Sequence, residues 1–200
     1  MKRIFPLFAS VIILIFLGCS QAPKEVMIDS FEGELTSKTV DFGASKGSSI
    51  KIEASADKKA CGAQSMKLTY ILKPSGYMWA ARGFNLDVKG AAQWMVNPKD
   101  VKWNKYKAIS IYVYGAGSGG VIAFDIKDSG REIWRYLLDD DFTGWKEIIC
   151  PLKQFFPRKD WQPNDADNNE KLDFPIMSFQ FEPRLPGKGV YYFDCVKLIR

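Results

Sequence analysis

Eight short runs in which polar and apolar residues alternate dominate the chain from residue 49 onward. Gly, Pro, Asp or Asn separates most runs, and no segment keeps a 3.6-residue apolar period over three turns. An alternation of period two is typical of β-strands that bury one face. The runs cover residues 49–54, 65–72, 108–114, 120–126, 132–138, 145–150, 177–182 and 190–198. So many antiparallel strands predict an all-β chain folded as a sandwich or jelly roll.

The first eighteen residues follow a different pattern. Lys2 and Arg3 precede an apolar stretch over residues 4–17, which is shorter than the ~20 residues that a membrane-spanning helix needs. Gly18 ends the stretch directly before Cys19. This arrangement resembles the lipobox of bacterial lipoproteins, in which the cysteine becomes the lipidated N-terminus. The resemblance implies an exported protein that is attached to a membrane through Cys19.

This interpretation divides the chain into three parts. We expect a lipoprotein signal peptide over residues 1–18, a lipidated tether over residues 19–25 and one β-domain over residues 26–200. The expected location is the cell envelope, and by resemblance to enterobacterial lipoprotein sorting Ser20 after the cysteine favours the outer membrane if the cell is Gram-negative. An uncleaved anchor, or a plain secretory signal with an incidental cysteine, remains the alternative.

The chain contains no histidine. Ser-His-Asp and Cys-His triads, histidine zinc sites and histidine general bases are therefore excluded. The formal net charge is +5, and removal of Lys2 and Arg3 with the signal peptide leaves 5 − 2 = +3. The remaining basic residues are scattered, so the charge does not indicate a nucleic-acid partner.

Three cysteines remain in the expected β-domain, and an odd number leaves at least one unpaired. Cys150 lies in an apolar run and is most simply a small buried residue. An oxidising compartment allows a bridge between Cys61 and Cys195, which the sequence alone does not prove.

Several motifs follow one another in a fixed order along the domain. They are MIDSFEG at residues 27–33, QSMKLTY at 64–70, GYMW at 76–79, DDDFTGWKEI at 139–148, CPLKQF at 150–155, FPRKDWQP at 156–163 and GVYYFDCVKL at 189–198. Together they resemble family 11 carbohydrate-binding modules over residues 27–198. The resemblance implies a galactose-binding-like jelly-roll β-sandwich whose concave face binds a β-glucan-like polysaccharide without cutting it.

Sugars are bound by aromatic rings that stack on their apolar faces and by charged or amide groups that bond their hydroxyls. By resemblance, Tyr77 falls on a binding tyrosine of the family. Arg158, Asp160 and Trp161 fall on an arginine, an aspartate and a tyrosine of its cleft. Trp79 lies beside the same turn as Tyr77. These five residues are the first candidates for a carbohydrate site.

Strand alternation adds Arg135, Gln180 and Glu182 as residues that line the same surface, although periodicity does not say which face is concave. Ile133 stands where the family has a cleft histidine, and Met177 also replaces a polar cleft residue. The specificity for mixed-linkage β-glucan is therefore left open. Three other large aromatic residues are expected in the core: Phe124, Trp145 and Phe155.

The resemblance also implies a structural calcium ion where the first and last strands meet. Asp29 or Glu32, together with Asp194, would supply oxygen ligands of the kind that calcium prefers. Simple solvated carboxylates are the alternative.

Two other functions compete with carbohydrate binding. A sandwich similar to the complex I intermediate-associated family would serve as an envelope assembly or scaffold lipoprotein with no sugar ligand. A jelly-roll glycosidase would need two paired carboxylates, and the Glu-x-Asp-x-x-Glu strand of one such group is missing. We therefore expect a binding protein rather than an enzyme, with a polysaccharide, the membrane and envelope enzymes as its partners.

Overall fold

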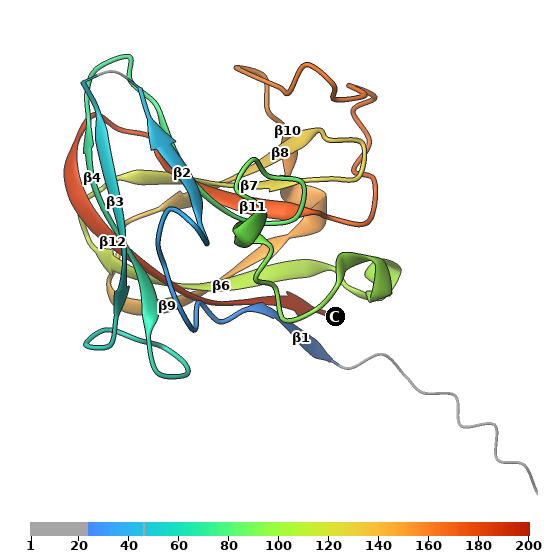
Figure 1. Cartoon of the computed structure of the whole chain (residues 1–200), viewed down its shortest axis with the longest axis horizontal. Coiled ribbons are helices and arrows are strands. Elements are labelled where there is room, and N and C mark those ends of the chain that lie inside the picture. The colour runs from blue at the N-terminus through green and yellow to red at the C-terminus, as the bar shows by residue number, and fades with distance from the viewer. Residues whose placement is uncertain (1–23, 46) are drawn as a thin grey trace, which may run out of the picture.

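The computed structural model describes residues 24–45 and 47–200. Within them the chain forms twelve strands in two antiparallel sheets that face each other, joined by loops with four short 3-10 helices (Figure 1). No helix of this part is long and apolar enough to cross a membrane. The expected signal peptide and Cys19 lie outside the described residues.

The first sheet, called sheet A, contains the long C-terminal strand at its centre. Its order is β3 (Ser49–Ser55), β4 (Ser65–Leu72), β12 (Gly187–Ile199), β6 (Ala108–Ala116) and β9 (Thr143–Pro151), and β1 (Glu25–Asp29) pairs with the end of β12. The second sheet, called sheet B, has the order β10 (Phe156–Pro157), β8 (Ile133–Asp139), β7 (Val121–Lys127), β11 (Ser178–Pro183), β5 (Met78–Gly83) and β2 (Asp41–Ala44). This arrangement confirms the predicted β-sandwich.

The core fills the space between the two sheets. In β7, Phe124 and Ile126 are fully buried, and Phe181 of sheet B stacks on Phe193 of sheet A with ring centroids 3.9 Å apart. Stacked and edge-on aromatic pairs stabilise such a core beyond the area that they bury. Phe124 and Phe155 are buried, which confirms that part of the prediction.

Trp145 was expected in the core, and that prediction is wrong. Trp145 pairs with Tyr114 across β9 and β6, while the neighbouring Val113 points into the core. Alternation therefore turns the Trp145 ring to the outer face of sheet A, where it is half-buried against Tyr114 with centroids 5.5 Å apart. Period-two patterning alone did not identify which side of this strand is inside.

All eight predicted runs form strands, and four further strands were not predicted. These are β1, β2, β5 and β10. Two of them, β2 and β10, are too short to show an alternating pattern. The loop from Phe84 to Lys107 carries η1 (Lys89–Ala91), η2 (Pro98–Asp100) and η3 (Trp103–Lys105), and η4 (Leu152–Gln154) follows β9.

A disulfide joins Cys61 to Cys195 across 134 residues of sequence. The bridge that the cysteine count allowed is therefore present. Cys150 is free and fully buried, as expected. Burial raises the pKa of the Cys150 thiol to about 12, so this cysteine is unreactive at neutral pH.

Candidate functional site

Sheet B turns one side to the core and the other side outward. In β7, Phe124 and Ile126 point into the core, so Asp125 and Lys127 face outward. On each of the six strands, one residue lies in register with Asp125 and shares its side of the sheet. The resulting row is Phe156, Arg135, Asp125, Gln180, Ala81 and Asp41.

Arg135 is the centre of a charge network on this outer face. Its Nε and Nη2 atoms each donate to a different oxygen of Asp125 at 2.7 Å, and Nη2 also donates to Glu182 at 2.8 Å. All three residues are buried, although they lie on the outer side of the sheet. Burial raises the pKa of Asp125, and the hydrogen bond and charge of Arg135 oppose that rise. A buried bidentate pair of this kind fixes the geometry of both groups.

Two further arginines complete the network. Arg158 donates to Glu182 at 2.7 Å and to Asp160 at 2.9 Å, and Arg184 donates to Glu182 at 2.8 Å and lies 3.6 Å from Asp160. With Arg135 and Asp125, three arginines therefore face three carboxylates, and the network has no net charge. A neutral network of fixed donors and acceptors is suited to an uncharged ligand rich in hydroxyl groups.

Trp161 marks the β10 end of the face. The residue is 55% exposed, and the Arg158 guanidinium lies 5.6 Å from the centroid of its ring. Burial alone raises the pKa of Asp160, but the hydrogen bond and charge of Arg158 outweigh burial and hold that pKa below its ordinary value. Asp160 therefore stays ionised beside Trp161.

Gln162 holds this segment against the sheet. Its side-chain amide accepts from the Ile133 backbone N–H at 2.7 Å and donates to the Ile133 carbonyl at 2.9 Å. The Ile133 carbonyl also accepts from the Arg158 backbone N–H at 2.8 Å, so the amide and the backbone together hold the chain against β8 just beyond β10. The long polar segment after β10 is consequently anchored at the point where Trp161 leaves the sheet.

Tyr77 and Trp79 mark the opposite end, at β5 and β2. Their rings stack with centroids 6.2 Å apart and an interplanar angle of 20°. Tyr77 is 56% exposed, while Trp79 is half-buried and donates its Nε1 hydrogen to Asp41 at 3.1 Å. The outer face of sheet B therefore has exposed aromatic residues at both ends and a polar row between them.

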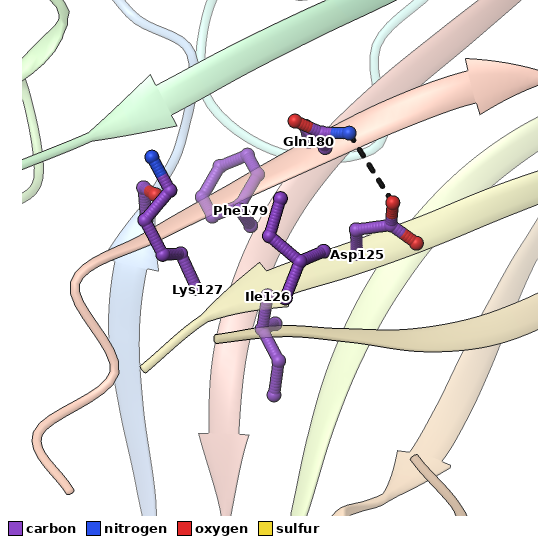
Figure 2. Close-up of a pocket in the computed structure, with 7 residues that line it drawn as sticks. Asp125, Ile126, Lys127, Phe179 and Gln180 are labelled. Atoms are coloured by element: carbon purple, nitrogen blue, oxygen red, sulfur yellow. Dashed lines mark hydrogen bonds between the residues drawn. The ribbon is translucent and has the colours of Figure 1, made fainter. Parts of the chain in front are cut away.

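A shallow hollow with space for about one water molecule lies between the two ends. Figure 2 shows Gln180 turned toward Asp125, to which it donates at 3.2 Å, with Lys127 on the same side. Burial lowers the pKa of Lys127, and its ammonium donates to the Asn85 carbonyl at 3.3 Å. Sites that enclose a drug-sized ligand usually measure ~300–1,000 Å³, so this hollow suits an open surface contact rather than an engulfed ligand.

The structure brings all the predicted carbohydrate-binding residues to this one face. Arg158, Asp160 and Trp161 lie at the β10 end, Tyr77 and Trp79 at the β2 end, and Gln180 and Glu182 on β11 between them. Arg135 lies on the same face, where it contacts Asp125, Asp160 and Glu182.

Four residues of the face were missed by sequence reasoning: Asp41, Asp125, Lys127 and Arg184. Asp125 alternates with buried residues of the predicted strand over residues 120–126, and Lys127 follows that strand directly, so the same alternation that suggested Gln180 would have found them. Asp41 and Arg184 carried no such signal, because β2 is only four residues long and Arg184 lies beyond the end of β11.

The three carboxylates expected to bind calcium all accept hydrogen bonds within the protein. Both oxygens of Asp29 accept from Arg82, at 3.0 and 2.9 Å, in a buried pair. Glu32 accepts from the Ala63 backbone N–H. Asp194 accepts from three backbone N–H groups, those of Ala60, Cys61 and Cys195. An ion would have to displace these donors, and calcium binding stays a prediction of the resemblance alone.

Comparison with known proteins identifies relatives of the whole domain. The family model described as carbohydrate binding domain (family 11) matches residues 18–200. Endoglucanase H of Acetivibrio thermocellus is 27% identical over 186 residues, which are 89% of this chain and 18% of that protein. The chain therefore spans less than a fifth of that curated relative.

Solved structures agree with this match. A family 11 carbohydrate-binding module from Clostridium thermocellum, in complex with a β-1,3-1,4-mixed-linked tetrasaccharide, has a TM-score of 0.70 and 27% identity, covering 90% of this chain and 97% of that one. The family 30 module of a cellulosomal cellulase from the same organism has a TM-score of 0.57 at 15% identity, covering 87% and 96%. The second likeness shows the fold alone.

Proposed function

The chain belongs to the carbohydrate-binding domains of family 11, and from this premise we propose that it binds a β-glucan chain along the outer face of sheet B without cleaving it. One observation carries the proposal. Aromatic residues lie at both ends of this face, Trp161 at one and Tyr77 and Trp79 at the other, and a row of fixed hydrogen-bonding groups lies between them. A solved relative of the same family holds a mixed-linked tetrasaccharide.

The dimensions of the face favour a polymer over a single sugar. Six strands lie side by side from β10 to β2, and five spacings of ~4.8 Å place the two edges about 24 Å apart. A ligand must be extended to contact the rings at both ends. The partly exposed members of the network, Gln180, Asp160 and Arg184, offer hydrogen-bonding groups to hydroxyls along the way, and their contacts with the buried members keep the cost of side-chain ordering low.

The groups on this face support binding rather than hydrolysis. A glycosidase needs one carboxylic acid to protonate the leaving group and a second carboxylate that is free to act as nucleophile or base. Here Asp125, Asp160 and Glu182 each accept hydrogen bonds from arginine. These carboxylates act as anchors for the arginines.

Native gels that contain soluble mixed-linkage β-glucan test the proposal. We expect the glucan to retard the protein, and Trp161→Ala and Tyr77→Ala each to weaken the apparent affinity roughly two- to tenfold, because a stacked ring contributes about 0.5–1.5 kcal/mol. Trp145→Ala is the matched control: it removes a half-buried ring from the outer face of sheet A and should leave retardation unchanged.

Other soluble polymers establish the linkage that is bound. Ile133 lines the hollow, at the position where the sequence resemblance implies a histidine in the family, so cellulose-derived and β-1,3-linked glucans should be run beside the mixed-linked one. Retardation by none of these polymers would contradict the proposal and favour a scaffold that binds no sugar. An equal loss of glucan affinity in Trp145→Ala and Trp161→Ala would show that the binding site is not the outer face of sheet B.

We also propose that Cys19 carries a lipid that holds the domain at the cell envelope, where it would keep glycan close to envelope enzymes. The support is the apolar stretch over residues 4–17 and the Gly18-Cys19 junction. Mass spectrometry of the protein from its native membrane should show a mature chain that begins at a modified Cys19. An intact Met1 or an unmodified Cys19 would contradict the anchor.

A further inference from the structure

Gly43 lies in the middle of the edge strand β2, directly opposite Trp79 in the pairing of β2 with β5. The six-membered ring of Trp79 occupies the space that a side chain at this position would need. A Cβ atom on Gly43 would lie 2.5 Å from Cη2 and 2.8 Å from Cζ2 of that ring. Because non-bonded carbons settle ~3.5–4.0 Å apart, any larger residue must push the ring away.

The backbone does not itself require glycine here. Gly43 has no left-handed φ angle, unlike Gly33 or Gly83, so an alanine would fit the strand conformation. Glycine inside a strand weakens it and often marks a close approach of another group. The group at Gly43 is the Trp79 ring.

Asp41, two residues before Gly43 on β2, also holds the Trp79 ring. Its Oδ1 accepts the Trp79 Nε1 hydrogen at 3.1 Å, and its Oδ2 accepts the Asp87 backbone N–H at 3.2 Å. The carboxylate is therefore itself held in place. It gives the indole one defined orientation over β2.

Tyr77 is fixed to the end of the same strand. Its backbone N–H donates to the Ser45 hydroxyl at 2.9 Å, and its carbonyl accepts from the Ser45 N–H at 2.8 Å. Its ring then stacks on Trp79. The position of the exposed Tyr77 ring therefore depends on the position of the Trp79 ring.

We infer that Gly43 and Asp41 are positioning residues for carbohydrate binding: they hold Trp79 on the edge strand, and Trp79 in turn supports the exposed ring of Tyr77. The platform so formed consists of Asp41, Gly43, Tyr77 and Trp79. This inference rests on the proposed function of the outer face of sheet B, and it gives β2 the role of positioning the aromatic rings at that end of the face.

A double-mutant cycle tests whether Gly43 acts through Trp79. We expect Gly43→Ala to weaken retardation by mixed-linkage β-glucan roughly two- to tenfold in the wild-type background, about the effect of a lost stacked ring. In the Trp79→Ala background the same substitution should have no further effect, because the ring that it displaces is gone. Asp41→Ala should behave in the same way as Gly43→Ala.

Near-ultraviolet circular dichroism gives a second readout that does not need the glucan. Gly43→Ala should change the aromatic spectrum of the wild type and leave that of Trp79→Ala unchanged. Equal losses of affinity in both backgrounds would overturn the inference, as would a shifted spectrum without any loss of affinity. If the wild-type protein binds no glucan, the proposed function fails, and the two spectra alone still decide whether Gly43 positions the ring.

Discussion

Replacing Arg135 with methionine is expected to lower the free energy of unfolding by about 3–5 kcal/mol, the usual cost of removing one partner from a buried ion pair. Arg135 neutralises Asp125 through two hydrogen bonds and Glu182 through a third. Without it, Asp125 keeps a contact with Arg158 at 3.5 Å and a bond from the neutral Gln180 amide. The buried Asp125 carboxylate then lacks the positive charge of Arg135 that stabilises its ionised form.

The measurement is urea denaturation, followed by tryptophan fluorescence, of the wild type and two variants. Arg184→Met is the matched control, because Arg184 shares Glu182 with Arg135 but is about one-third exposed. Exposed ion pairs contribute only ~0–1 kcal/mol, so this variant should remain close to the wild type. Equal stabilities of Arg135→Met and the wild type would contradict the buried network.

A double substitution separates the stability of the network from its role in binding. Arg135→Met combined with Asp125→Leu removes one charge of each sign and leaves Arg158 and Arg184 facing Asp160 and Glu182. Apolar replacement of a whole buried pair is often neutral for stability, so most of the lost stability should return. Glucan retardation by this double variant should stay weaker than that of the wild type, because Gln180 loses its bond to Asp125 and Asp160 loses its contact with Arg135.

The fold was predictable because its strands obey a simple rule. Every alternating run became a strand, as in β7, where Phe124 and Ile126 enter the core and Asp125 turns outward. The rule does not say which side of a sheet another sheet will cover. Trp145 shows this limit: its strand was found, but its ring packs on the outer face of sheet A against Tyr114.

The candidate site was predictable at its ends and less so in its middle. Tyr77 and Trp161 were suggested by the motifs that resemble the family. The ion pairs that connect Asp125, Arg135 and Glu182 join three strands, and Gly43 meets Trp79 only through the pairing of β2 with β5. Such contacts depend on register, which local sequence patterns do not encode.

Opening the Cys61–Cys195 disulfide is expected to lower the free energy of unfolding by about 2–5 kcal/mol, because the bridge closes a loop of 134 residues and so restricts the unfolded chain. The native domain should keep its shape. Asp194 still accepts from the Ala60 and Cys61 backbone N–H groups, at 2.8 and 3.0 Å, and so holds this loop against β12 without the bridge.

Urea denaturation with and without a phosphine reductant measures the decrease in the free energy of unfolding. A double Cys61→Ser and Cys195→Ser variant should show the same decrease. Cys150→Ala controls for the third cysteine, whose burial keeps it out of thiol exchange. Because the bridge lies at β12 of sheet A, glucan retardation of the reduced but folded protein should equal that of the oxidised protein. If the reduced protein is as stable as the oxidised protein, the bridge does not restrict the unfolded chain. If the reduced protein stays folded but is no longer retarded by glucan, the disulfide affects the outer face of sheet B.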